Sequence, residues 1–194
     1  MRIDFKKMRP KNFNSYLYKS VEKLAKNVEK GSGNRNINKC PVCNCIKKKN
    51  YIVKYNIPIV TCTKCDLTYT AKQPKNFNDV YSQSDYLEKS ILSYDKNRKY
   101  RIKRFGLERI KLLRKYKKKG KLLDFGCGTG WFLEGAKNYF DSYGVEYSDS
   151  IREWLLKKFN IKAFKTLEDI THEKFDIITA FDVIEHVPSP LNLL

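Results

Sequence analysis

Apolar positions recur at helical spacing in two parts of this chain. Over residues 12–30 the apolar side chains fall three or four residues apart while lysines occupy the other faces, which predicts one amphipathic helix. The same period returns over residues 97–119 and ends at Gly120. The expected apolar face of this second helix consists of Ile102, Phe105, Ile110, Leu113 and Tyr116, with arginines and lysines facing the other way.

Strand-like and helix-like runs alternate after residue 120. The expected order is strand 121–125, helix 131–140, strand 143–147, helix 150–160, strand 161–165 and strand 175–184. Alternation at this spacing is typical of βαβ units. The pattern therefore predicts an α/β fold built on a parallel sheet.

A cysteine-bounded segment precedes this region. Cys40 and Cys43 form one C-x2-C pair, Cys62 and Cys65 form a second, and 18 residues separate the pairs. This spacing is typical of four-thiolate zinc sites, in which each pair forms a tight turn with both sulfurs on one side. The runs 51–55, 58–62 and 67–70 predict short strands between and after the pairs. We expect a zinc ribbon.

The role of the zinc has two interpretations. A structural ion would hold together about 30 residues, too few to build a core alone. The alternative is a ribbon that grips nucleic acid through Lys47, Lys48, Lys49 and Lys54. Asn44 and Asp66 follow the two turns, where a left-handed backbone is expected. Cys45 is either a replacement ligand or a bystander.

Four segments follow from these patterns. Residues 1–38 carry the amphipathic helix and a polar linker, Gly31 to Asn38. Residues 39–70 form the zinc ribbon, and residues 71–96 form a connector with a short helix around residues 81–92. Residues 97–194 form the N-terminal part of the α/β domain.

Composition narrows the class of protein. The chain has 194 residues, 41% hydrophobic and 31% charged, which suffices for one core and a small satellite module. No run of about 18 apolar residues, and no apolar signal-peptide core, is present. We therefore expect a soluble, cytoplasmic protein without a transmembrane segment.

Positive charge is unevenly distributed. The chain carries a formal charge of +19; residues 1–120 hold 32 basic and 9 acidic side chains (+23), and residues 121–194 hold 8 and 12 (−4). A basic N-terminal segment indicates an anionic partner such as nucleic acid. The competing and favoured interpretation is a compositional preference for lysine that gives a solvated surface.

A glycine loop follows the first strand of the α/β region. Asp124 precedes glycines at alternate positions, Gly126, Gly128 and Gly130. Glycines let the backbone turn sharply and let a ligand lie against bare main chain. A carboxylate beside the loop repels a pyrophosphate and suits a cationic amino-acid nucleoside.

This Asp-x-Gly-x-Gly-x-Gly stretch resembles the class I S-adenosylmethionine (SAM)-dependent methyltransferases. The resemblance extends to Glu146, which comes 20 residues after Gly126 at the end of the second strand. Residues 175–187 resemble the fourth strand and following turn of the subgroup that includes ubiquinone-biosynthesis and glycan-associated methyltransferases. An N-terminal ribbon with paired cysteines also occurs in that subgroup.

The resemblance implies a Rossmann-like sheet with strand order 3-2-1-4, and it implies roles for individual residues. Asp124 would lie near the methionine amino group and Glu146 on the ribose. Cys127 would pack or offer its backbone N–H. The other implied cofactor contacts are Gly126, Gly128 and Gly130 along the methionine chain, and Phe164 and Phe181 beside the adenine.

His186 is the candidate general base, because imidazole titrates near neutral pH. The resemblance also allows Asp182, Glu185 and His186 to bind a divalent cation beside the acceptor. The third interpretation is a purely local hydrogen bond at the end of the strand.

The sequence ends at Leu194, where the helix after the expected fourth strand would begin. A complete domain of the class has three further strands, so we expect its C-terminal part to be missing. Strand 175–184 would then form an exposed, apolar sheet edge.

Three functions fit the sequence. The first is a SAM-dependent methyltransferase that acts on a small molecule or glycan precursor. The second is an RNA methyltransferase, although the fourth strand lacks the Asn/Asp-Pro-Pro-aromatic pattern of base-amine methylation. The third is a non-catalytic, zinc-ribbon nucleic-acid-binding protein with a truncated nucleotide fold.

Overall fold

The computed structural model describes residues 34–75, 97–170, 172–187 and 189–193, together with Ser15, Tyr18, Lys19, Glu22 and Lys26. The chain divides into two compact units, residues 1–11 with 88–186 and residues 12–87 with 187–194. The five isolated positions are helical, as expected for the segment 12–30, whose other residues lie outside the described set. The helix expected around residues 81–92 also lies outside it.

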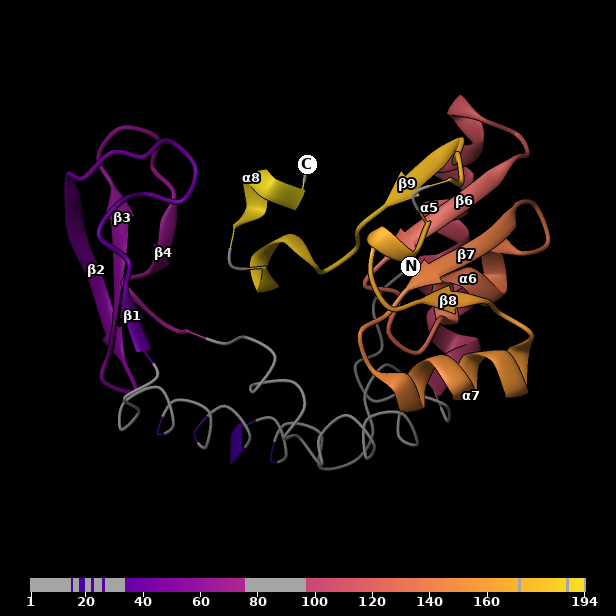
Figure 1. The fold of residues 1–194 in the computed structure, drawn as a ribbon, viewed down its shortest axis with the longest axis horizontal. Coiled ribbons are helices and arrows are strands. Elements are labelled where there is room, and N and C mark those ends of the chain that lie inside the picture. Colours follow the sequence, from indigo (N-terminus) through magenta and orange to yellow (C-terminus); the bar gives the residue numbers. More distant parts are fainter. Residues whose placement is uncertain are drawn as a thin grey trace. The chain divides into compact units, whose positions relative to one another are not determined.

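The cysteine-containing unit holds two small antiparallel sheets (Figure 1). Strands β2 (Lys48–Lys54), β3 (Ile57–Cys62) and β4 (Thr68–Thr70) form a three-stranded sheet in that order. Strands β1 (Asn34–Asn36) and β5 (Lys72–Pro74) form the second sheet. The three strands expected in this segment are present. Within the polar linker expected over residues 31–38, residues 34–36 form a strand instead, because they pair with residues 72–74.

The hairpin between β2 and β3 turns at Tyr55 and Asn56, with φ angles of 51° and 57°. Positive φ at both central residues matches the twist of the flanking strands. The hairpin and β4 enclose a core of four buried residues, Cys40, Val60, Cys62 and Tyr69. Among the described residues, a core of this size is too small to stabilise these three strands alone.

The second unit contains a four-stranded parallel sheet (Figure 1). Its strands are β6 (Lys121–Phe125), β7 (Asp141–Val145), β8 (Ala163–Phe164) and β9 (Ile177–Thr179). They lie in the order β8-β7-β6-β9, which corresponds to 3-2-1-4 in chain order. The predicted α/β class and parallel sheet are confirmed.

The helical elements of this unit include a π-helical turn and two 3-10 turns. They are η1 (Ile102–Gly106), α5 (Leu107–Tyr116), α6 (Trp131–Ala136), α7 (Asp149–Phe159), η2 (Glu168–Ile170) and η3 (Ile184–His186). A further short helix, α8 (Pro190–Leu193), belongs to the other unit. No helix in the described part of the chain is long and apolar enough to cross a membrane.

Several elements are shorter than the sequence suggests. The fourth strand covers residues 177–179 instead of 175–184, because Asp182 adopts φ = 57° and residues 184–186 form a 3-10 turn. The helix expected over residues 131–140 ends at Ala136, whose carbonyl accepts the N–H groups of Tyr139 and Phe140. The third strand keeps two of its five expected residues.

Two side chains in residues 97–119 differ from the burial expected for this helix. Tyr116, expected in the core, is 84% exposed. Arg98, expected on the solvent side, is 5% exposed. The basic side of this helix therefore does not all face water, and Arg98 has partners inside the unit.

Candidate cofactor site and metal centre

The carboxyl end of β6 runs into the glycine loop. Gly126, Gly128 and Gly130 adopt φ angles of 69°, 51° and 62°, a region that side-chain-bearing residues rarely occupy. Gly130 is the N-cap of α6, so the loop connects the central strand directly to a helix. This strand-to-helix turn matches the prediction.

The three loop glycines differ in what surrounds them. A Cβ on Gly126 would lie 2.6 Å from Val183 Cγ2, and a Cβ on Gly130 would lie 2.5 Å from Leu155 Cδ2. A Cβ on Gly128 would meet nothing within 4 Å. The outer two glycines therefore allow close packing within the protein. Gly128 exposes bare main chain to open space, where a ligand could lie.

Asp124 is buried at the carboxyl end of β6, with 4% of its surface exposed. Thr179 Oγ1, on the adjacent strand β9, donates a hydrogen bond of 2.7 Å to Asp124 Oδ1. Burial raises the pKa of Asp124 to about 7, although the Thr179 hydroxyl and the positive charge of Arg109 favour the ionised form. A cationic group that binds beside Asp124 therefore favours the ionised form of this carboxyl group. No local sequence pattern distinguishes Thr179.

Glu146 lies immediately after β7, on the neighbouring side of β6. Its Oε2 accepts the Gly128 N–H at 3.0 Å, and its Oε1 accepts the Ser148 N–H at 2.9 Å. Burial raises the pKa of Glu146, while these N–H groups and the charge of Arg152 lower it. The structure thus brings the second predicted carboxylate onto the glycine loop.

Arg152, on α7, fixes the main chain around Glu146. Its Nη1 donates to the carbonyl oxygens of Glu146 (2.6 Å) and Tyr147 (2.8 Å). Its Nη2 pairs with Asp149 in the first turn of the same helix. This arginine lies in a run of mixed polarity, and no sequence signal distinguished it.

Arg98 connects the helical segment before η1 to the glycine loop. Its Nη1 donates to the Thr129 carbonyl at 2.6 Å, and its Nε pairs with Glu134 of α6. Its guanidinium carbon lies 3.6 Å from the centre of the Phe159 ring. Through these contacts the buried Arg98 fixes the position of the glycine loop.

The end of β9 carries a different group of side chains. Arg109, on α5, lies 3.9 Å over the Phe181 ring, and its Nη2 is 3.6 Å from the Asp182 carboxylate. Phe181 also packs edge-on against Phe132, with ring centroids 5.0 Å apart. Phe181 follows β9, which borders β6 on the side opposite to β7, the strand that Glu146 follows.

The other predicted residues lie as follows. The Cys127 side chain is buried, and its N–H donates to the Val145 carbonyl at 3.0 Å, so this N–H is not available to a ligand. Phe164 is half-buried and stacks on Tyr143. His186 is exposed in η3, and its N–H donates to the Val183 carbonyl at 2.8 Å.

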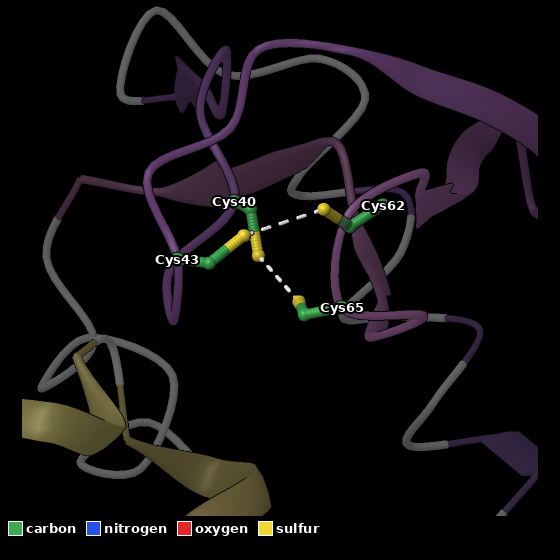
Figure 2. A group of neighbouring side chains, drawn as sticks. All are labelled: Cys40, Cys43, Cys62 and Cys65. Atoms are coloured by element: carbon green, nitrogen blue, oxygen red, sulfur yellow. Dashed lines mark hydrogen bonds between the residues drawn. The ribbon is translucent and has the colours of Figure 1, made fainter.

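The four paired cysteines meet in the other unit (Figure 2). The sulfurs lie within 4.8 Å of one another, and the Cys40–Cys65 and Cys43–Cys62 sulfur distances are both 3.5 Å. Four thiolates around a tetrahedral zinc, with Zn–S bonds of about 2.3 Å, lie about 3.8 Å apart. The sulfur geometry therefore fits zinc.

Both cysteine turns have the same backbone pattern. The Cys40 N–H donates to the carbonyl five residues later, and the carbonyl of Cys40 accepts the Asn44 N–H. Cys62 makes the corresponding bonds, the second of them with Asp66. Asn44 and Asp66 have φ angles of 57° and 56°, which confirms the expected left-handed positions.

Two other metal-ligand candidates do not join a cluster. Cys45 Sγ bonds to the Lys47 carbonyl at 3.7 Å and is not one of the four grouped sulfurs. Asp182, Glu185 and His186 also fail to form a group of possible ligands. Within the described ranges, the four cysteines are the only such group.

A glycine loop and two carboxylates at the carboxyl edge of a parallel sheet define a nucleotide-type binding domain. Residues 94–194 match the family model described as a methyltransferase domain, and this match covers over half of the chain. The chain belongs to this family and is a SAM-dependent methyltransferase. No curated protein matches the chain.

Proposed function

We propose that the carboxyl edge of β6 and β7 binds SAM and that the protein transfers its methyl group to a small molecule or glycan precursor. The observation that carries this proposal is the juxtaposition of Asp124, buried beside the loop, with the open space at Gly128. SAM carries an ammonium and a sulfonium cation, and both are favoured beside carboxylates.

Different residues of this edge are proposed to bind different parts of SAM. We assign the methionine ammonium to Asp124, the methionine chain to the bare main chain at Gly128, and the ribose hydroxyls to Glu146. The adenine is assigned to Phe164, since β8 follows β7 in the sheet. Phe181, expected beside the adenine, lies by β9 instead, so we place it toward the methionine and acceptor.

SAM supplies an electrophilic methyl group on a positively charged sulfur, and the protein's task is to align the acceptor and remove its proton where needed. Asp124 and Glu146 are proposed to orient the methionine ammonium and the ribose of the cofactor. His186 is proposed as the proton acceptor, because it follows β9 on the side where the acceptor would approach. Its exposure leaves the imidazole accessible to the acceptor.

The acceptor class rests on the resemblance of residues 175–187 to glycan-associated and ubiquinone-type methyltransferases. Incubation with methyl-labelled SAM, followed by separation of small molecules from RNA, tests it. We expect label in small molecules, from a panel of nucleotide sugars and phenols, and loss of labelling in His186→Ala. Label confined to RNA contradicts the proposed acceptor.

The four cysteines are proposed as a structural zinc site that completes the small core of their unit. The support is the sulfur spacing and the matching backbone turns. Metal analysis should give about one zinc per chain. Cys62→Ser should lose most of the metal, while Cys45→Ser, which changes the adjacent thiol, should keep it. Equal metal content in both variants contradicts the assignment.

The SAM site is tested by filling the space at Gly128. Gly128→Val should weaken SAM binding at least about a hundredfold in calorimetry, because the side chain occupies the ligand's place and strains a residue at φ = 51°. Asn160→Val is the matched control, since Asn160 has the same φ at the end of α7. It should lower thermal stability without changing SAM affinity in the folded protein. Equal SAM affinities in the two variants contradict the proposed site.

A further inference from the structure

We propose that strand β2 is a docking edge that pairs with an extended, acidic segment of a partner protein. This inference concerns the cysteine-containing unit and goes beyond the proposed methyl transfer. It rests on three observations: an open strand edge, exposed apolar side chains along it, and a local excess of positive charge.

The edge of β2 is open. In the part of the chain that the structure describes, β2 pairs with β3 alone and forms one margin of the three-stranded sheet (Figure 1). All seven residues of β2 are exposed. A strand at a sheet edge presents unpaired N–H and C=O groups, which accept a further strand from another chain.

Apolar side chains are exposed on and beside this strand. Tyr51 is 69% exposed, Ile52 is 52% exposed and Val53 is 64% exposed, and Ile46 just before the strand is 67% exposed. Four of the eight residues 46–53 therefore expose apolar side chains. Ile52 and Val53 are consecutive residues of β2, so their side chains lie on opposite faces of the sheet, and both faces of this edge present apolar surface near lysines.

The charge of residues 34–75, which surround β2, is almost entirely positive. Residues 34–75 hold nine lysines and arginines and one acidic residue, Asp66, a net charge of +8 (9 − 1). The strand register places Lys49, Ile52 and Lys54 opposite alternate residues of β3, so they share one face of the sheet. An added strand with acidic residues on that face would meet two lysines and an isoleucine.

These features favour an acidic protein strand over two other occupants. A second copy of this chain pairing through β2 would bring the lysines of both copies together, and like charges opposite one another destabilise a sheet. Single-stranded nucleic acid would use the lysines and Tyr51, but bases stack on aromatic rings and gain little from Ile52 and Val53. Lysines on an edge strand therefore disfavour self-pairing, whereas the acidic side chains of an added strand would pair with them.

The test uses the full chain purified with zinc and a fluorescent, end-capped peptide of seven residues that alternates glutamate and valine. Binding is followed by fluorescence anisotropy at low salt, where exposed ion pairs are least screened. A second peptide has the same sequence with its internal amides N-methylated, which keeps the charge and removes the N–H donors. We expect this change to weaken binding by about tenfold.

Charge variants locate the binding edge. Lys49→Gln with Lys54→Gln should weaken peptide binding by about fivefold. The matched control, Lys39→Gln with Lys64→Gln, removes the same charge from exposed positions beside the cysteine turns and should change it by less than twofold.

Four outcomes would overturn the proposal. The first is that the peptide does not bind, and the second is that its N-methylated form binds equally well. The third is an equal loss of binding in the two charge variants, which would indicate diffuse attraction. The fourth is tighter binding of a twelve-nucleotide oligouridylate than of the peptide, dependent on Lys49 and Lys54, which would make this surface a nucleic-acid site.

Discussion

Asp124 combines burial with a weak set of compensating contacts. Among the described residues, the Thr179 hydroxyl donates to its side chain, and the charge of Arg109 acts on it from α5. These contacts offset only part of the cost of burying a carboxylate, so its pKa stays near 7. A carboxyl group in this state gains its full charge when a cation binds beside it.

SAM affinity should therefore depend on pH through Asp124. As the pH rises from 5 toward 7, Asp124 ionises and the affinity for the methionine ammonium should increase, by up to about tenfold per pH unit. Asp124→Asn should bind SAM weakly at every pH in this range. Calorimetric titrations at several pH values measure both. An unchanged pH dependence in Asp124→Asn would assign the titration to another group.

The same carboxyl affects folding stability, with the opposite sign. Between about pH 4 and 7 the folded chain keeps a proton that the unfolded chain has lost, so the free energy of unfolding should fall as pH rises, by up to roughly 4 kcal/mol. Asp124→Asn should lack this decrease, so denaturant unfolding at pH 5 and pH 7.5 should differ less in the variant than in the natural protein. Parallel changes in both proteins would show that Asp124 does not cause the decrease.

At the scale of elements, the glycine loop is held from two sides. Glu146, just after β7, accepts the Gly128 N–H, and Arg98, in the helical segment before η1, donates to the Thr129 carbonyl. Arg98 also pairs with Glu134, so it ties the loop to α6. The conformation of the loop thus depends on an arginine that does not belong to the sheet.

Arg98 can be tested separately as a stabilising and as a positioning residue. Arg98→Met should destabilise the fold by about 3 kcal/mol, because Glu134 loses its partner. Adding Glu134→Gln should restore part of this stability but leave SAM affinity about tenfold weaker, because the Thr129 carbonyl is no longer held. Thermal denaturation and calorimetry separate the two effects. Full recovery of SAM affinity in the double variant would mean that Arg98 acts through stability alone.

Local patterns predicted some elements well and others poorly. Strand β6 and both cysteine turns were predictable, because apolar periodicity, fixed spacing and turn-forming residues all act over a few positions. Strands β1 and β5 were not, since Asn34–Asn36 and Lys72–Pro74 are polar and form strands only by pairing with each other. The roles of Arg98 and Thr179 depend on contacts between distant segments, which periodicity does not reveal.

At the scale of the whole molecule, the chain consists of two compact units with different sources of stability. The methyltransferase unit buries large aliphatic residues such as Leu122, Leu133 and Leu155, which pack around a parallel sheet. In the part of the cysteine-containing unit that the structure describes, the buried cluster consists of four residues, two of which are cysteines. Its stability should therefore depend on the metal far more than that of the other unit.

Removal of zinc should separate these two contributions. Calorimetry of the zinc-loaded protein should show two unfolding transitions, and a chelator should abolish one of them and leave the other in place. Cys62→Ser should behave like the chelated protein, and Cys45→Ser like the untreated one. A single transition that responds as a whole to chelation would show that the two units unfold together.

The proposed function depends on the binding of SAM by Asp124 and the glycine loop. Isothermal titration of SAM into the full chain measures this binding, with Asp124→Ala compared with Asp141→Ala, an exposed aspartate at the far end of β7. We expect one SAM per chain, loss of measurable binding in Asp124→Ala and unchanged binding in Asp141→Ala. The same SAM affinity in Asp124→Ala as in the natural protein would contradict it.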